Sequence, residues 1–383
     1  MNLAEARERG ATLDLAEQRA FLLNRRHALR LVFWELTSGC NLRCQHCRAE
    51  AQPERDPDEL TTDEIRAVID DLASFANPIL ILTGGEPLYR PDFFEIASHA
   101  SARGLRVAMA TNGTLVDAEV ARRAAQAGVV RASISIDGAR PETHDGFRGL
   151  PGSFARALEG ASHLRRAGVE VQFNFTVTRH NVDELDEIVR LARDQGARAV
   201  HLFMLVPVGC GLRIADDKML PAEEYERVLH WFYDQAQTVP LEFKATCAPH
   251  YFRVMMQRAR AEGRQVTFQS HGMAAMTKGC LAGTAVCFIS RTGQVQPCGY
   301  LPVAAGNVRQ EPLSRIWQGA PLFAELRDHG LLKGKCGACE YRTVCSGCRA
   351  RAYGCTGDYL AEEPFCVHVP RVHGRKGPAA GAV

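Results

Sequence analysis

The feature that most constrains this chain is its cysteines, which number 14 and gather mainly in two places. Cys40, Cys44 and Cys47 are separated by only three and two residues, and most of the others lie between 280 and 366. The N-terminal stretch 1–30 is rich in Ala, Arg and Glu and has no apolar core of an export signal, so we expect a cytoplasmic protein with reduced thiols. Cysteines at this density then predict metal or redox ligands.

The composition is that of an ordinary globular enzyme. A chain of 383 residues with 46% hydrophobic and 23% charged residues suits about two domains with a large core. Lys and Arg total 46 against 44 Asp and Glu, and a net charge of +2 gives no global reason to bind nucleic acid or an anionic membrane. No apolar run approaches the roughly 20 residues of a membrane helix. The partner must therefore be recognised by local sites.

From residue 31 to about 204 short apolar runs alternate with amphipathic segments, which predicts parallel strands joined by helices, an α/β fold. The predicted helix from residue 62 opens with a threonine and has Glu64 in its first turn, as a capping box requires. The predicted strands are 31–36, 79–83, 105–110, 131–136, 170–176 and 200–204, and the predicted helices include 62–75, 118–127, 153–167, 182–195 and 221–237.

After these helices the alternation stops, and the chain becomes rich in glycine, cysteine and short segments. We therefore predict a boundary between residues 240 and 278. The expected parts are an N-terminal helical extension (1–30), a partial α/β barrel (31–240), a linker and substrate-side segment (241–278), a small Cys-rich domain (279–370) and a mobile tail (371–383).

The first cysteine group directly follows the first predicted strand. A loop this tight can aim the thiolates of Cys40, Cys44 and Cys47 at one four-iron cubane and leave the fourth iron without a protein ligand. An open metal position is what a catalytic site keeps and a structural site closes. The alternative is a zinc site of the same three cysteines completed by His46.

This Cys-x3-Cys-x2-Cys loop resembles that of the radical S-adenosylmethionine (SAM) superfamily, and further motifs of that family follow the next strands in order. They are Thr-Gly-Gly-Glu-Pro at 83–87, Ala-Thr-Asn-Gly-Thr at 110–114, Ser-Ile-Ser-Ile-Asp-Gly at 133–138 and His-Asp-Gly-Phe-Arg at 144–148. The resemblance implies a partial (β/α)6 barrel with a catalytic [4Fe–4S] cluster. It also implies SAM contacts from Gly84, Gly85, Glu86, Pro87, Asn112, Ser133, Ser135, Asp137 and Arg148.

The second cysteine group resembles the SPASM extension of radical SAM enzymes, which binds auxiliary iron–sulfur clusters. The gap before Cys348 is one residue shorter than in the family pattern. The family's interleaved arrangement implies one cluster on Cys280, Cys287, Cys298 and Cys348 and another on Cys336, Cys339, Cys345 and Cys366. A single auxiliary cluster, or a zinc ribbon on Cys336, Cys339, Cys345 and Cys348, remain alternatives, and Cys210, Cys247 and Cys355 are left without a role.

The segment Phe-Lys-Ala-Thr-Cys-Ala-Pro-His-Tyr-Phe-Arg at 243–253 resembles the haem b synthases of the alternative, sirohaem-dependent haem pathway. Stretches 46–51, 295–301 and 348–353 resemble the same enzymes. This resemblance implies that a 5'-deoxyadenosyl radical starts the decarboxylation of two Fe-coproporphyrin III propionates to vinyls. That reaction is an oxidation, and auxiliary clusters suit it because they offer an outlet for the electrons.

A tetrapyrrole with four propionates needs cations near its pocket, where arginine suits carboxylates best. The expected substrate residues are Arg213, Lys244, Arg253 and Arg349, with His250 as iron ligand or proton donor and Cys247 as a substrate-side ligand. The resemblance also implies an external reductant such as flavodoxin or ferredoxin. Alternatives are an enzyme acting on didecarboxysirohaem, a peptide-modifying SPASM maturase and a non-enzymatic electron carrier, although the last would have no use for the SAM motifs.

Overall fold

The computed structural model describes residues 27–271, 274–275 and 277–371. The expected N-terminal extension (1–30) and tail (371–383) therefore lie almost entirely outside the described residues. No helix in the described part of the chain is long and apolar enough to cross a membrane.

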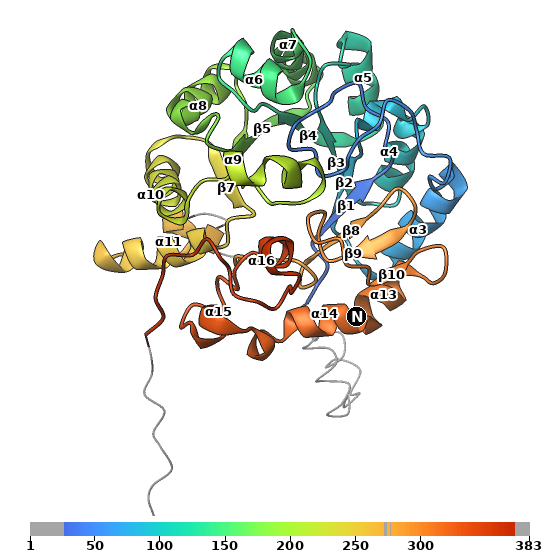
Figure 1. Ribbon diagram of the computed structural model, residues 1–383. Coiled ribbons are helices and arrows are strands. Elements are labelled where there is room, and N and C mark those ends of the chain that lie inside the picture. The colour runs from blue at the N-terminus through green and yellow to red at the C-terminus, as the bar shows by residue number, and fades with distance from the viewer. Residues whose placement is uncertain (1–26, 272–273, 276, 372–383) are drawn as a thin grey trace, which may run out of the picture.

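One curved sheet of ten strands forms the centre of the molecule, in the order β10-β9-β8-β1-β2-β3-β4-β5-β6-β7, and helices surround its outer face (Figure 1). The pairs from β1 to β7 and the β1–β8 pair are parallel, whereas β8–β9 and β9–β10 are antiparallel. The strands are β1 (Leu31–Glu35), β2 (Ile79–Thr83), β3 (Arg106–Thr111), β4 (Val129–Ser135), β5 (Glu170–Val177), β6 (Ala199–Met204), β7 (Glu242–Thr246), β8 (Val286–Ile289), β9 (Gln294–Gln296) and β10 (Gly306–Asn307).

Helices alternate with the parallel strands, as the sequence pattern predicts, and shorter helices follow in the Cys-rich part. The helices of the barrel are α3 (Thr62–Phe75), α4 (Phe93–Ala102), α5 (Ala118–Gln126), α6 (Pro141–Arg148), α7 (Ser153–Arg166), α8 (Leu185–Asp194), α9 (Ala215–Lys218), α10 (Ala222–Thr238), α11 (His250–Ala261) and α12 (Phe268–His271). Those of the Cys-rich part are α13 (Leu313–Gly319), α14 (Pro321–Arg327), α15 (Gly334–Ala338) and α16 (Arg349–Thr356).

The α/β prediction is confirmed, but segment 241–278 is not the linker that the sequence suggested. It contains β7, which pairs in parallel with β6, and α11, which packs against α10. The Cys-rich part also continues the same sheet, because β8 pairs in parallel with β1. The short, partly polar β7 carries no apolar run, which is why the pattern did not reveal it.

The two faces of the sheet differ in polarity. On β5 and β6, Phe173 and Leu202 belong to the main apolar core beneath the helices. The intervening side chains point to the opposite face, because side chains alternate along a strand. Asn174, His201 and Lys244 are neighbours in register there, across β5, β6 and β7. We use the term lumen for the concave side of the curved sheet, which this inner face borders (Figure 1).

Helix α3 begins with the capping box that the sequence predicts. The Thr61 hydroxyl accepts the backbone N–H of Glu64, and the Glu64 carboxylate accepts the Thr61 N–H at 2.7 Å. Hydrogen bonds from Arg309 and from Thr61 lower the pKa of Glu64 to about 2, so the carboxylate is ionised at neutral pH. Because Arg309 follows β10, this cap also ties the Cys-rich part to the barrel.

Thr61→Ala should lower the free energy of unfolding by about 1 kcal/mol, the usual contribution of such a cap. Denaturant titration of the anaerobic protein measures the change. Ser74→Ala, at an exposed position near the end of the same helix, is the matched control and should have a smaller effect. An equal loss in both variants would contradict this role of the cap.

Candidate active site and cluster sites

Cys40, Cys44 and Cys47, which we call the radical site, lie in the loop after β1, where the N–H of Cys47 donates to the carbonyl of Cys44 at 3.2 Å. Burial raises the pKa of Cys40 to about 12 and that of Cys44 to about 11. Thiols of this kind lose their protons only to a metal, so iron binding there releases protons. Three thiols on one tight loop are a donor set that fits a four-iron cluster with one open iron.

The turn after β2 packs directly on this cysteine loop. The N–H of Gly85 donates to the carbonyl of Thr37 at 2.7 Å. A Cβ on Gly84 would lie 2.8 Å from the Thr37 oxygen, and a Cβ on Gly85 would lie 2.5 Å from the Ser38 oxygen and 2.6 Å from that of Gly39. Real Cβ atoms do not come so close to backbone, so only glycine permits this contact.

Glu86 continues the same contact and carries a buried carboxylate. Its N–H donates to the carbonyl of Gly39 at 2.8 Å, and its side chain accepts the Thr111 hydroxyl at 2.7 Å and the Asn112 N–H at 2.8 Å. The Asn112 amide in turn donates to Asn41 of the cysteine loop at 2.9 Å. Burial raises the pKa of Glu86 to about 7, and an ammonium group beside it would favour the ionised form. Glu86 is therefore suited to the amino group of SAM.

Pro87, Ser133 and Ser135 complete the residues expected near SAM. Pro87 is buried and opens a short 3₁₀ helix for which Glu86 is the N-cap. Ser133 and Ser135 lie two residues apart on β4 and so share one face of the sheet. Ser135 pairs in register with Asn174, which places both serines on the lumen side near the carboxyl end of β4.

Asp137 and Arg148 form a buried ion pair against the radical site. An Arg148 Nη atom lies 2.5 Å from Asp137, and the other lies 3.7 Å from the Cys44 sulfur. His46 Nε2 lies 3.3 Å from the same Asp137 oxygen, and the His46 ring stacks on Phe147 with centroids 4.3 Å apart. His46 thus holds Asp137, which argues against a zinc ligand role, and the Arg148 Nε has no partner among the described residues.

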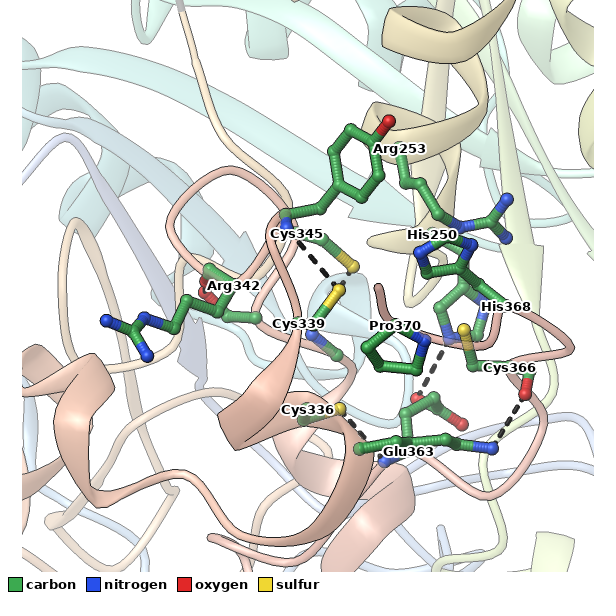
Figure 2. A pocket seen from close by; sticks show the side chains of 14 residues that line it. His250, Arg253, Cys336, Cys339, Arg342, Cys345, Glu363, Cys366, His368 and Pro370 are labelled. Atoms are coloured by element: carbon green, nitrogen blue, oxygen red, sulfur yellow. Dashed lines mark hydrogen bonds and ion pairs between the residues drawn. The ribbon is translucent and has the colours of Figure 1, made fainter. Parts of the chain in front are cut away.

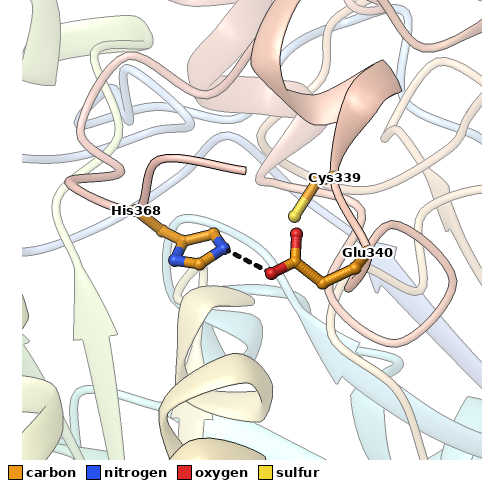
Figure 3. A group of neighbouring side chains, drawn as sticks. All are labelled: Cys339, Glu340 and His368. Carbon is orange, nitrogen blue, oxygen red and sulfur yellow. Dashed lines mark hydrogen bonds and ion pairs between the residues drawn. The ribbon is translucent and has the colours of Figure 1, made fainter. Parts of the chain in front are cut away.

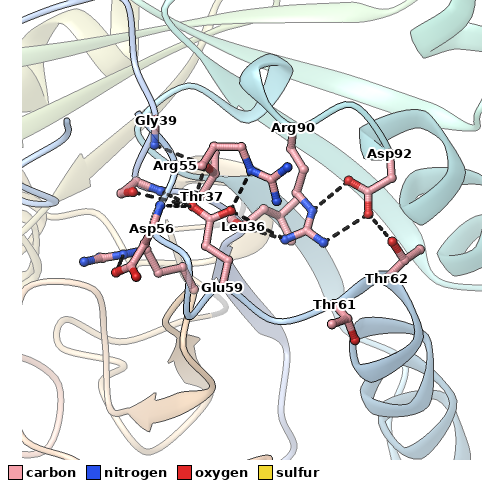
Figure 4. Close-up of polar contacts among 12 residues, drawn as sticks. Leu36, Thr37, Gly39, Arg55, Asp56, Glu59, Thr61, Thr62, Arg90 and Asp92 are labelled. Carbon is pink, nitrogen blue, oxygen red and sulfur yellow. Dashed lines mark hydrogen bonds and ion pairs between the residues drawn. The ribbon is translucent and has the colours of Figure 1, made fainter. Parts of the chain in front are cut away.

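Glu59 fixes the start of the cysteine loop, as Figure 4 shows. Its buried carboxylate accepts the Thr37 hydroxyl at 2.7 Å and the Ser38 N–H at 2.9 Å. Arg55 donates to it at 2.8 Å, and Arg90, 3.9 Å from it, also donates to the carbonyl of Leu36 at the end of β1. The loop is therefore anchored on both sides by buried charges that the sequence motifs did not reveal.

Cys280, Cys298 and Cys348, which we call the hairpin site, come together beside β8 and β9. Cys348 acts electrostatically on both other thiols. Cys287 does not join them. It lies in the main apolar core on β8, and burial alone raises its pKa to about 12. The expectation that Cys287 completes this ligand set is therefore contradicted by the geometry.

A second set, Cys336, Cys339, Cys345 and Cys366, lines a small pocket of about 20 Å³ (Figure 2), and we call it the outer site. Because Cys348 lies in the hairpin site, the zinc-ribbon grouping is not formed. Cys339 is also within 4.8 Å of Glu340 and His368, whose carboxylate and ring lie 3.2 Å apart (Figure 3). These three residues border the outer site and share its cysteine, so they are part of that site.

The expected substrate residues divide into two groups. Lys244 faces the lumen, and Arg213 lines a pocket of about 320 Å³ beside Cys44 and Cys47. His250 and Arg253 instead line the outer site. The structure contradicts their placement in a substrate pocket.

The partners of the misplaced residues lie inside the fold. Arg253 pairs with Glu226, its closer contacts being 2.5 and 2.7 Å. His250 is fully buried, and its Nε2 lies 3.6 Å from Glu363. Arg349 donates to the carbonyls of Tyr359 and Ala361. His250 and Arg253 on α11 line the outer site, and Arg349 at the start of α16 lies 3.9 Å from the Cys336 sulfur, so these side chains serve the cluster sites.

Several residues of the sites had no individual role predicted from the sequence, although Arg48 and Arg351 lie in stretches that resemble haem b synthases. Arg48 pairs with Glu35 at 3.0 Å and covers the Phe288 ring at 4.5 Å, at the edge of the lumen. Arg351 and Glu363 form a fully buried ion pair at 3.2 Å. Single charged residues without motif spacing could be assigned only once the chain had been folded.

Gly85→Ala should prevent the turn after β2 from closing on the cysteine loop, so the radical site should lose its cluster. The expected result is a lower iron content after anaerobic reconstitution and loss of the electron paramagnetic resonance (EPR) change that SAM addition causes. Gly146→Ala is the control, because a Cβ there meets nothing within 4 Å. A full iron content and a normal SAM response in Gly85→Ala would refute this packing argument.

Two family models match this chain. The model of the radical SAM superfamily matches residues 34–196, and that of the SPASM iron–sulfur cluster-binding domain matches residues 280–349. The "AdoMet-dependent heme synthase" of Methanosarcina barkeri is 54% identical over 344 residues, which cover 90% of this chain and 98% of that protein. The protein of the same name from Nitratidesulfovibrio vulgaris is 51% identical over 342 residues, covering 89% and 93%.

More distant relatives carry related names. The "Pre-heme d1 synthase" of Dinoroseobacter shibae is 35% identical, covering 88% of this chain and 85% of that protein. Among solved structures, Streptococcus suis SuiB bound to S-adenosylmethionine has a TM-score of 0.72 at 15% identity, covering 92% of this chain and 81% of that one. At that identity the likeness concerns the fold alone.

Proposed function

Because the chain belongs to the radical SAM enzymes that carry a SPASM iron–sulfur domain, we propose that it converts Fe-coproporphyrin III to haem b. The observation that carries this proposal is the 54% identity to an AdoMet-dependent heme synthase, since it extends over the barrel and both cysteine groups. The proposed reaction is the oxidative decarboxylation of two propionates to vinyls. Each loses one hydrogen atom, one carbon dioxide and one electron.

The radical-site cluster and SAM supply, when bound, a 5'-deoxyadenosyl radical that abstracts the hydrogen atom. The protein holds SAM with groups at the carboxyl ends of the strands. Glu86 offers a buried carboxylate to the amino group, and the backbone of Gly84 and Gly85 keeps that carboxylate beside Cys40. Arg148 remains the proposed partner of the SAM carboxylate, with Asp137 fixing its guanidinium.

Lys244 is the proposed anchor for a propionate. It lies on the lumen face of β7 beside His201, and it has no carboxylate partner among the described residues. Lys244 keeps exposed surface on the lumen side, and desolvation by the surrounding protein lowers its pKa, which an anionic ligand would reverse. Arg213 is the proposed second cation, since it is largely exposed at the pocket beside Cys44 and Cys47 and holds only a loose contact of 3.6 Å with Glu50.

The remaining partners follow from the chemistry. The enzyme needs an external one-electron reductant, for which a flavodoxin or ferredoxin is the proposed class. All its cysteines are free, which suits the reducing cytoplasm that we propose as its location. The second candidate function is the processing of another iron tetrapyrrole such as didecarboxysirohaem. Relatives that are named as synthases of other tetrapyrroles are less similar to this chain, with identities near one third. This difference favours the first candidate.

Anaerobically reconstituted enzyme with SAM and a reductant should convert Fe-coproporphyrin III to haem b and form 5'-deoxyadenosine. Mass spectrometry of porphyrin and nucleoside measures both products. Cys44→Ala should abolish both, because the radical site then lacks one of its three ligands. Deoxyadenosine without any change in the porphyrin would refute the substrate and leave the radical chemistry intact, whereas both products from Cys44→Ala would refute the radical mechanism.

Lys244→Met should raise the KM for Fe-coproporphyrin III about tenfold or more, the loss expected for one charge-assisted hydrogen bond. SAM cleavage without substrate should stay unchanged. Lys244→Arg is the matched control, because it keeps the positive charge and should recover most of the affinity. An unchanged KM in Lys244→Met would contradict the role of Lys244.

A further inference from the structure

Cys247 has an unusual backbone at the end of β7. Its φ of +54° lies in the left-handed region, which residues with a Cβ seldom adopt. Two buried donors hold its carbonyl in this position, the Tyr225 hydroxyl at 2.9 Å and the Arg351 guanidinium at 2.8 Å. A strained backbone that its surroundings enforce in this way points to a functional constraint on the side chain.

The strained backbone aims the Cys247 thiol at the hairpin site. The thiols of Cys247, Cys298 and Cys348 are close enough to interact electrostatically. Cys247, Cys298 and Cys348 pack in the same small apolar cluster, which includes Val206 and Leu301. Cys280 completes the group through its interaction with Cys348. Four thiols from four separate segments thus meet at one place.

The direction of β8 explains why Cys287 cannot take part. Phe288 faces the lumen, where Arg48 covers its ring. The side chain before it must point to the opposite face, and Cys287 accordingly lies in the core, in register with Val32 of β1. The hairpin site lies with Tyr300 at the lumen edge, so Cys287 and the other thiols are on different sides of the sheet.

We propose that Cys247, and not Cys287, is the fourth ligand of an iron–sulfur cluster whose other ligands are Cys280, Cys298 and Cys348. With four thiolates from the protein, this cluster has no open iron for the substrate. It therefore serves as an electron outlet and does not anchor the tetrapyrrole. The inference rests on the part of the proposed function that requires auxiliary iron–sulfur clusters, and it does not depend on the identity of the substrate.

The test compares ligand variants of the reconstituted full-length enzyme by iron and sulfide analysis and by EPR. Cys247→Gly removes the sulfur and suits the positive φ, so it should fold. It is expected to lose one iron and convert one cubane to a three-iron form. Cys247→Ser keeps an oxygen donor at the same place and should retain the iron with shifted g-values. Cys287→Ala is the matched control, with iron content and spectra like those of the wild type.

The opposite pattern would overturn the assignment. Wild-type iron content and spectra in both Cys247 variants would exclude Cys247 as a ligand, and loss of a cluster in Cys287→Ala would return Cys287 to the set. A misfolded Cys247→Gly variant would also lose SAM cleavage. In that case the g-values of the Cys247→Ser variant, compared with those of the wild type, decide whether Cys247 is a ligand. A failure to make haem with all cluster spectra as expected would refute the substrate alone.

Discussion

The cluster sites of this fold depend on burying thiols beside balanced pairs of charges. Each site has a buried arginine that is paired with a carboxylate. Arg148 pairs with Asp137 at the radical site, Arg351 with Glu363 at the hairpin site and Arg253 with Glu226 at the outer site. A buried arginine without its carboxylate would be strongly destabilising, and a carboxylate alone would repel the thiolates. Such a pair adds no net charge, and at the radical site the guanidinium of Arg148 also lies 3.7 Å from the Cys44 sulfur.

The sheet brings these pairs to the ligands. The three arginines are far apart in sequence and lie on α6, α16 and α11. Each of these helices begins or ends near the carboxyl edge of the parallel strands. Parallel strands place their chemistry at that edge. The same geometry places Cys247, whose backbone is strained, at the end of β7, where its carbonyl accepts a hydrogen bond from Arg351. Thus Arg351, a residue of the Cys-rich part, fixes both the end of the barrel and the thiols that meet there.

Much of this could be predicted from the sequence, because apolar runs and cysteine spacing are local signals. The six core strands form within about two residues of their expected positions. The radical-site loop and the turn after β2 also lie together as expected. The places of Cys247, Cys287 and Arg253 could not be predicted, for a different reason. Spacing along the chain does not say which face of a short strand a thiol occupies, and β7 has no apolar run that would have placed Cys247 at a strand end.

Glu363 shows how the two auxiliary sites are joined. Its carboxylate accepts the N–H of Cys348 at 2.9 Å, while its own N–H lies 3.3 Å from the Cys336 sulfur. A second link runs from the N–H of Cys280 to the carbonyl of Cys345 at 3.1 Å. The hairpin site lies at the lumen edge, and the outer site opens beside the exposed Glu340. With clusters bound at the hairpin and outer sites, these hydrogen bonds would connect the lumen edge to the surface, and the two clusters could carry away the electron that an oxidative decarboxylation releases.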